Sequence, residues 1–432
     1  MALQASLVLV FVFTLLLLFS VPISFSIVIA SLVTIITIMP VDMAIFTAAQ
    51  KMVTGIDSFS LLAVPFFILA GILMNNGGIA YRLVNFAKVL VGKAPGALAH
   101  SNIIGNMMFG SLSGSSVAAA AAIGGVMGPL QKKEGYDPRF SAAANIASAP
   151  TGLIIPPSGT LIIYSLVSGG TSIAALFIAG YIPGILWGIA CMVVAFLIAR
   201  KKGYRVNEKV TVKLFFKTFL DAIPSLLMIV VVIGGIVAGI FTATEASAIA
   251  VLYTFILSFA IYRTVKLKDM PGILLNTVSI TSVIMFLVAA SSVMSWVMAF
   301  TGLPALISDA ILSISTNMYV ILIVLNIILL AIGTFMDITA AVLIFTPIFL
   351  PIVQQFGMDP VHFGIMMVLN LSIGNITPPV GSALFVGASI AKLDLEDVIK
   401  PLLPFYLAII VVLILVTFLP EISLFLPKVL GY

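Results

Sequence analysis

The sequence predicts an all-α polytopic membrane protein built as an inverted repeat. Its 432 residues are 62% hydrophobic and only 8% charged, whereas about a quarter of the residues in a soluble domain are charged. Apolar runs follow one another from end to end, and a set of Pro, Gly and Asp landmarks recurs at one spacing. These observations leave no room for a soluble catalytic domain. We expect each half to contain five spans, one of them broken in mid-membrane, and one re-entrant hairpin.

Ten apolar segments are predicted to cross the bilayer. About 20 helical residues are needed, because each rises about 1.5 Å and the hydrocarbon core is about 30 Å thick. The first segment lacks the basic start of a signal peptide and continues into further spans, so we expect it to be retained. The predicted spans are 5–20, 22–39, 59–75, 139–169, 177–199, 223–241, 246–263, 281–300, 361–392 and 401–420.

Two further apolar stretches, 97–130 and 318–353, are predicted to be re-entrant hairpins. Each carries a polar or Gly-rich break near its middle, at Ser111–Ser116 and Gly333–Asp337 respectively. A hairpin returns to its own side, so it does not reverse the loops that follow.

The distribution of basic residues tests this topology. With 76–96 placed in the cytoplasm, 18 of the 20 Lys and Arg residues lie on that side, as the positive-inside rule requires. This split depends on both hairpins being re-entrant, and it places both termini in the periplasm. The predicted cytoplasmic segments are 76–96, 131–139, 200–222, 263–280 and 392–400.

The repeat joins residues that lie 222 positions apart. An odd number of spans in each half inverts the second half relative to the first, an arrangement found in many membrane transporters. The units are 1–222, which includes a linking cytoplasmic segment, and 223–432. Two polar segments at equivalent places, 40–58 and 262–280, are either interfacial arm helices or ordinary loops. The landmark pairs are Asp137 with Asp359, Gly152 with Gly374, Pro156-Pro157 with Pro378-Pro379, Gly159 with Gly381, and Pro129 with Pro351.

The segments around the two Pro pairs, 149–159 and 372–381, cannot stay helical, because Pro removes a donor and clashes with the preceding turn. Irregular backbone at membrane depth is tolerated only where protein or a water-filled cavity satisfies it. The freed carbonyl oxygens suit a hard cation such as sodium, and the N-termini of half-helices suit anions. A simple Pro kink is the alternative.

The hairpin tips carry the remaining polar groups. The hydroxyls of the Gly110–Ser116 tip can cap the next helix, bind a cation or contact a polar solute, and its small residues also permit close helix packing. Asp337 places a carboxylate in an apolar stretch, where charge is costly and indicates function. Asp337 can also cap the following helix, and the two roles are compatible.

Other chemistries find little support in the sequence. Cys191 is alone within an apolar run, which favours packing, and His100 and His362 lack neighbours at metal-ligand spacing. An intramembrane enzyme needs a nucleophile with a base or paired acids, but only one deep acid is present. A channel needs a continuous polar pore, and a structural subunit needs neither break. The protein is therefore expected not to be an enzyme.

Four motifs, taken in order, resemble the large membrane subunit of TRAP transporters, the tripartite ATP-independent periplasmic family of the ion-transporter superfamily. The resemblance covers essentially the whole chain. It implies an elevator-type secondary transporter of the bacterial inner membrane, in which 97–169 and 318–392 form a transport domain and the remainder a scaffold. The motifs are SGSSVAAAAAIG, SAPTGLIIPPSGTLIIY, GTFMD and IGNITPPVGSALFVG.

The resemblance also implies two sodium sites, each between one hairpin tip and one broken helix, with sodium as the only metal. Carried over by position, the first site draws on Ser113, Ser115, Ser116, Pro150 and Gly152. The second draws on Gly333, Thr334, Asp337, Gly374 and Thr377. The expected solute contacts are Ser116, Pro156, Ser158 and Asn375.

The partners that the resemblance implies are a small four-helix membrane subunit and a periplasmic substrate-binding protein, with no nucleic acid. The sequence starts directly with large-subunit helices, so the small subunit is expected to be a separate chain. The solute is expected to be an organic acid, either a sialic acid or a C4-dicarboxylate, which the binding protein delivers for import. The alternative is a sodium-coupled carboxylate exchanger of related architecture that works without a binding protein.

Overall fold

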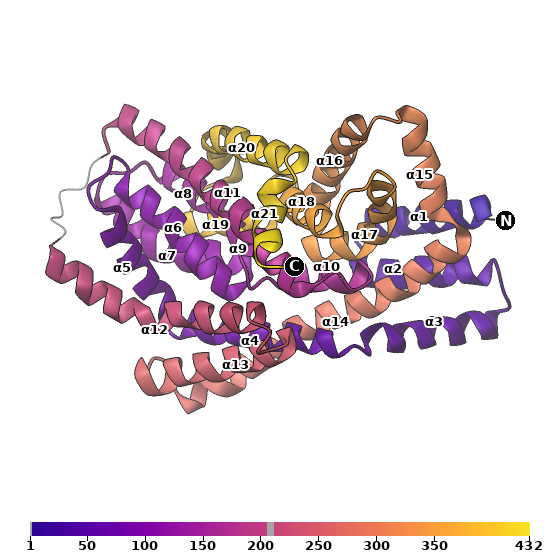
Figure 1. Ribbon diagram of the computed structural model, residues 1–432, viewed down its shortest axis with the longest axis horizontal. Coiled ribbons are helices and arrows are strands. Elements are labelled where there is room, and N and C mark those ends of the chain that lie inside the picture. Colours follow the sequence, from indigo (N-terminus) through magenta and orange to yellow (C-terminus); the bar gives the residue numbers. More distant parts are fainter. Residues whose placement is uncertain (1, 205–210) are drawn as a thin grey trace.

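The computed structural model describes residues 2–204 and 211–432, and this part of the chain is helical with no β-strand (Figure 1). The all-α prediction is confirmed. Residues 205–210, within the predicted cytoplasmic segment 200–222, lie outside the described residues.

The first half contains α1 (Ala2–Leu18), α2 (Ile23–Ile36), α3 (Val41–Ile56), η1 (Phe59–Leu62), α4 (Ala63–Asn76), α5 (Ile79–Val91), α6 (Ala97–Ser113), α7 (Ser116–Lys133), α8 (Pro138–Ser148), α9 (Thr151–Ile154), α10 (Gly159–Val167) and α11 (Ile173–Lys202). The second contains α12 (Val212–Val237), α13 (Ala243–Ile256), η2 (Leu257–Ile261), η3 (Leu267–Asp269), α14 (Met270–Thr301), α15 (Leu303–Ile314), α16 (Met318–Phe335), α17 (Ile338–Gln354), α18 (Pro360–Gly374), α19 (Ser382–Ala391), α20 (Leu395–Phe418) and α21 (Glu421–Val429). The starts of α7 and α17 are 222 residues apart, as are those of α8 and α18, and of α11 and α20. The repeat therefore holds at the level of individual helices.

In each predicted hairpin the two ends lie at the same end of the molecule, as a re-entrant hairpin requires. In the first, Gln131 Nε2 near the end of α7 donates to the Leu98 carbonyl at the start of α6, at 3.1 Å. The turn between α6 and α7 uses Gly114 at φ 61°, a conformation that costs Gly little. The second hairpin is closed through α20. The ring of Tyr319, at the start of α16, lies 5.8 Å from that of Phe418. The Nε2 atom of His362, in the first turn of α18, which follows α17, is 2.7 Å from the Val416 carbonyl.

Seven helices of the described part are long and apolar enough to cross a membrane, and the bent pair Pro138–Ile154 and Gly159–Val167, with a 46° break, makes an eighth. Six of the seven correspond to predicted spans, and the seventh is α16, an arm of the second hairpin. The first two predicted spans are the shorter helices α1 and α2, with 17 and 14 residues. The predicted span 361–392 is split into α18 and α19.

A chain of contacts connects all five segments that were predicted to be cytoplasmic, so these segments lie at one face of the molecule. Their side of the membrane stays a prediction. Three of the contacts are ion pairs: Arg82–Asp221 at 3.2 Å, Lys202–Asp137 at 2.9 Å and Arg139–Asp397 at 2.8 Å. The fourth is a cation–π contact, in which the Arg82 guanidinium lies 3.6 Å from the ring centre of Tyr262. Tyr262 directly precedes the segment 263–280.

Some predicted boundaries are wrong. The second arm and the span after it form one helix, α14, because no Pro or Gly interrupts residues 273–301. The first arm is a separate helix, α3, which lies beside α14 (Figure 1). Helix α5 lies in a segment that was predicted to be a loop. Its apolar residues, including Ile79, Leu83 and Val84, are buried along one face, and a short amphipathic pattern of this kind does not stand out as an apolar run. Helices α15 and α21, and the first turns of α12, were also missed.

Candidate ion and solute sites

Both spans that carry a Pro pair are broken, as predicted. Between α8 and α10 the chain makes a single turn, α9, and then runs extended to Ser158, whose Oγ accepts from Leu161 N at 3.4 Å and caps α10. In the second half, α18 ends at Gly374 and α19 begins at Ser382. The peptide bonds Pro156-Pro157 and Pro378-Pro379 are both cis.

Each hairpin tip touches the break that follows it through backbone atoms. A Cβ added at Gly152 would lie 2.3 Å from the Cα of Gly110, and one added at Gly374 would lie 2.3 Å from the carbonyl carbon of Gly333. Such distances are far shorter than any real carbon contact, so only Gly allows these approaches. The predicted pairing of tips with breaks is therefore what the structure shows.

The first tip gathers the three predicted serines. Ser115 Oγ accepts from Ala118 N at 3.2 Å and caps α7, and Ser113 Oγ lies 3.5 Å from the Ser115 carbonyl. Gly152 packs on the last turn of α6, as described above. The Pro150 carbonyl accepts from Leu153 N at 2.9 Å within the turn of α9.

The second tip presents carbonyl oxygens, hydroxyls and one carboxylate. The Thr334 carbonyl accepts from Val380 N at 3.1 Å, and the Thr377 hydroxyl donates to the Ile373 carbonyl at 2.7 Å. Asp337 caps α17, since its Oδ1 accepts from Thr339 N at 2.8 Å. The Asp337 side chain is exposed rather than buried in apolar surroundings, because the tip opens into a cavity.

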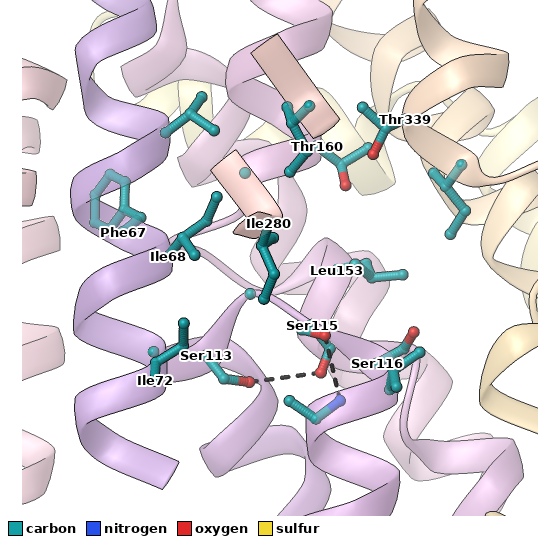
Figure 2. A pocket seen from close by; sticks show the side chains of 18 of the residues that line it. Phe67, Ile68, Ile72, Ser113, Ser115, Ser116, Leu153, Thr160, Ile280 and Thr339 are labelled. Carbon is teal, nitrogen blue, oxygen red and sulfur yellow. Dashed lines mark hydrogen bonds between the residues drawn. The ribbon is translucent and has the colours of Figure 1, made fainter. Parts of the chain in front are cut away.

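This cavity, of about 330 Å³, lies between the two tips and the helices α4 and α14. Figure 2 shows Ser113, Ser115 and Ser116 at one end of it, Thr160 and Thr339 at the other, and Phe67, Ile68 and Ile72 on α4. The polar residues that line it are Asn75, Ser113, Ser115, Ser116, Thr160, Asn276, Asp337, Thr339, Asn375 and Ser382.

A hydrogen bond in this cavity joins the two repeats. The buried Asn375 donates from Nδ2 to Ser116 Oγ at 2.5 Å. Its Oδ1 accepts from Ser382 Oγ and from Ala383 N, the latter at 3.3 Å. The first tip is thereby fixed to the second break.

Two of the four predicted solute contacts, Ser116 and Asn375, line the cavity, but Pro156 and Ser158 do not. Ser158 is fully buried, and its hydroxyl donates to the Leu153 carbonyl at 2.5 Å. The repeat could have indicated better choices, because Thr160 and Ser382 both line the cavity and are 222 residues apart. No sequence signal marked Asn75 and Asn276, which depend on how α4 and α14 pack.

The family model described as "Tripartite ATP-independent periplasmic transporter, DctM component" matches residues 10–422. The chain belongs to the TRAP transporter family as its DctM component. It is thus a multi-span membrane protein and a large permease subunit.

Curated relatives of this DctM component span nearly its whole length. YgiK of Salmonella typhimurium is 56% identical over 96% of the chain and 95% of its own length. The sialic acid TRAP transporter large permease protein SiaM of Vibrio cholerae is 42% identical over 89% of the chain and 90% of its own length. The C4-dicarboxylate TRAP transporter large permease protein DctM of Rhodobacter capsulatus is 37% identical over 91% and 92%.

Among solved structures, the Alcanivorax borkumensis YdaH transporter superposes with a TM-score of 0.66 at 12% identity. The match covers 87% of the DctM component and 88% of that chain. At this identity the likeness shows the fold alone.

Proposed function

We propose that the chain is the large permease subunit of a sodium-coupled secondary transporter in the bacterial inner membrane, which imports an organic acid delivered by a periplasmic binding protein. The observation that carries this proposal is the convergence of both hairpin tips and both helix breaks on one cavity. Of the relatives described above, SiaM is named for a sialic acid and the Rhodobacter capsulatus DctM for C4-dicarboxylates, and both of these solutes are carboxylates.

The charge of the cavity supports coupling to a cation. Among the described residues that line it, Asp337 is the one charged side chain, and its charge is negative. A carboxylate solute would therefore meet no Lys or Arg there, although a buried anion needs compensation. The N-termini of α7, α10 and α19 supply part of it, since Ser116, Gly159 and Ser382 line the cavity. Bound sodium would supply the rest.

The donor set at the tips fits sodium. Hard cations prefer oxygen ligands, and the predicted groups offer hydroxyls, backbone carbonyls and one carboxylate. We propose that Ser113, Ser115 and Ser116 hold one ion with carbonyls of the 150–152 turn. Thr334, Thr377 and the Asp337 carboxylate, with carbonyls at Gly333 and Gly374, would hold the other. Sodium would neutralise the solute while it crosses the bilayer.

The proposed moving body contains the two hairpins and the two broken helices, 97–169 and 318–392. We add α11 and α20, which were first predicted to belong to the scaffold, because both pack on the breaks. Trp187 Nε1 on α11 donates to the Ala147 carbonyl at 2.8 Å, and the Tyr406 hydroxyl on α20 donates to the Ile376 carbonyl. Glycines of α11 allow this approach, since a Cβ at Gly180 would lie 2.2 Å from the Ile154 carbonyl oxygen. Helices α1–α4 and α12–α14 would then form the scaffold.

The proposal is tested by uptake into proteoliposomes, with and without sodium, a small four-helix subunit supplied as a separate chain, and a periplasmic binding protein. We expect uptake of one carboxylate only with the complete set and an inward sodium gradient. Full uptake without the binding protein would instead favour a sodium-coupled exchanger. Sodium-independent uptake would contradict the coupling.

The elevator movement has its own test. A Cys at Thr160, in a background with Cys191 replaced by Ala, is paired with single Cys residues at successive turns of α4, such as Ile68 and Asn75. We expect two mutually exclusive cross-links at different depths, with a ratio that sodium changes. One cross-link depth under all conditions, with transport intact, would refute the elevator.

A further inference from the structure

A second cavity, of about 400 Å³, lies among α6, α7, α8 and α19, away from the tips. Its lining shares no residue with the tip cavity. Lys132 and Lys392, at the ends of α7 and α19, line it together with Gln131, Ser141 and Asn102. It therefore opens at the face where the basic segments gather. Along α7 the nearest lining residues of the two cavities are Ala118 and Gly124, which lie about 9 Å apart at about 1.5 Å per residue.

Two residues that line this cavity each carry a buried polar atom without a hydrogen-bond partner. Asn102 is fully buried and Ser141 is 6% exposed, and neither Asn102 Oδ1 nor Ser141 Oγ is bonded. Leaving such a group unsatisfied costs about 1–3 kcal/mol, so two such atoms on residues that line one cavity favour a ligand there. Neighbouring Asn145 is fully engaged, since its Nδ2 donates to the Ala120 carbonyl at 2.9 Å and its Oδ1 accepts from Asn102 Nδ2 at 3.2 Å.

The charges at the mouth are positive and uncommitted. Among the described residues, neither Lys132 nor Lys392 forms an ion pair. Two carboxylates of the same loops are already paired, Asp137 with Lys202 and Asp397 with Arg139. Glu134 and Asp394, each two residues from one of these lysines, do not line the cavity. Two ammonium groups outside and two unpaired oxygens inside match a molecule with a negative end and hydroxyl groups.

We propose that this cavity is a second site, which binds a hydroxylated organic carboxylate from the side of the basic face. The carboxylate lies between Lys132 and Lys392, and hydroxyl groups donate to Asn102 Oδ1 and exchange a hydrogen bond with Ser141. The bound molecule would bridge the first repeat, through α6–α8, to α19 of the second. The volume is within the range of small-molecule sites, about 300–1,000 Å³.

The test is calorimetric titration of the full chain in nanodiscs of zwitterionic lipid, in sodium-free buffer, with gluconate as the probe. Acetate, which lacks hydroxyls, and inorganic phosphate, which mimics a lipid headgroup, are titrated in parallel. We expect one gluconate per chain, bound more tightly than either comparison ion.

Two variants address the cavity directly. Gly128→Leu should abolish binding, because Gly128 lines the cavity and nothing lies within 4 Å of a Cβ placed there, so the helix tolerates a side chain that fills the space. The double variant Lys132→Gln, Lys392→Gln should weaken binding by at least about tenfold through the loss of two charged hydrogen bonds. The matched controls are Gly125→Leu and the pair Lys133→Gln, Lys400→Gln, none of which lines the cavity. They should bind as the unmodified chain does.

Asn375→Ala, in the tip cavity, should leave gluconate binding intact. The proposal is overturned if gluconate does not bind, if Gly128→Leu binds it normally, or if binding follows Asn375 instead. Equal binding of phosphate or acetate would likewise overturn it, because the hydroxyl groups would then play no part.

Discussion

The two hairpin tips share a backbone design and differ in their side chains. Each touches its broken helix at a Gly-Gly contact and each begins its second helix with a polar cap, Ser115 in the first and Asp337 in the second. The first tip offers uncharged hydroxyls, whereas the second offers a carboxylate. The shared backbone suits a task that both halves perform, such as cation binding by carbonyls, and the side chains suit tasks that belong to one half.

The breaks differ in the same way. Asn375 reaches across to Ser116, but the position 222 residues before it is Leu153, which also lines the cavity and offers no hydrogen bond. At the two breaks, side-chain recognition of the solute is therefore expected to be one-sided, although the architecture is a repeat.

The largest effect should come from the shared backbone. Gly152→Ala and Gly374→Ala each force a methyl group to within 2.3 Å of the facing chain. Overpacking of this kind costs about 1–3 kcal/mol or more. The facing atoms belong to the backbone of Gly110 and Gly333, so the hairpin tip itself would have to shift. We therefore expect both variants to lose nearly all uptake. Gly125→Ala, with open space around it, is the control and should transport normally. Transport by only one of the two Gly variants would break the symmetry between the tips.

The second-largest effect should come from the hydrogen bond between Asn375 and Ser116, which joins the two repeats. Asn375→Ala removes one hydrogen bond to Ser116 and two within the second break, and a typical hydrogen bond contributes about 0.5–1.5 kcal/mol. We expect about a tenfold rise in the solute concentration for half-maximal uptake. Leu153→Ala should alter it less, and the exposed Ser389→Ala should not alter it. An equal effect at Leu153 would contradict one-sided recognition.

A substitution at Asp337 can remove the charge of the second tip and still leave α17 capped. Asp337→Asn keeps an acceptor for Thr339 N, because Asn caps helices as well as Asp. We expect the protein to insert and to bind its small subunit, while the sodium concentration for half-maximal uptake rises several-fold. An unchanged sodium requirement would exclude Asp337 as a ligand.

The smallest effect should lie far from both tips, at Asp137. Burial alone would raise the pKa of this carboxyl, but hydrogen bonds from Lys202 and the Arg139 amide outweigh it and lower the pKa. A lowered pKa in the folded protein adds stability at neutral pH, and this contribution disappears as the pH falls through that pKa. Exposed ion pairs contribute about 0–1 kcal/mol, so Asp137→Asn should lower the thermal midpoint only slightly at pH 7. The difference in thermal midpoint between the variant and the unmodified chain should vanish in acid. A difference that persists in acid would show that the charge of Asp137 is not its cause.

The sequence predicted the hairpins and breaks because Pro, Gly and Ser interrupt long apolar runs at those places. Such interruptions can be recognised in the sequence without knowing how the helices pack. It did not predict α5 or α15, since short amphipathic helices take their stability from the surface they cover. The cavity was predicted only in part. Ser116 and Asn375 lie at the interruptions, but Asn75 and Asn276 are placed by helices whose sequence contains no break.

The hydrogen bond between Asn375 and Ser116 has a consequence for biosynthesis. The two residues are 259 positions apart, and chains grow at about 5–20 residues per second, so the first tip exists for roughly 13–50 seconds before its partner is made. Throughout that interval the nascent chain holds half of the cavity and no Asn375. Under the proposed function, a membrane that contains unfinished copies is expected to keep its sodium gradient, because the second proposed ion site includes Gly374 and Thr377 and is complete only when the ribosome nears the end of the message.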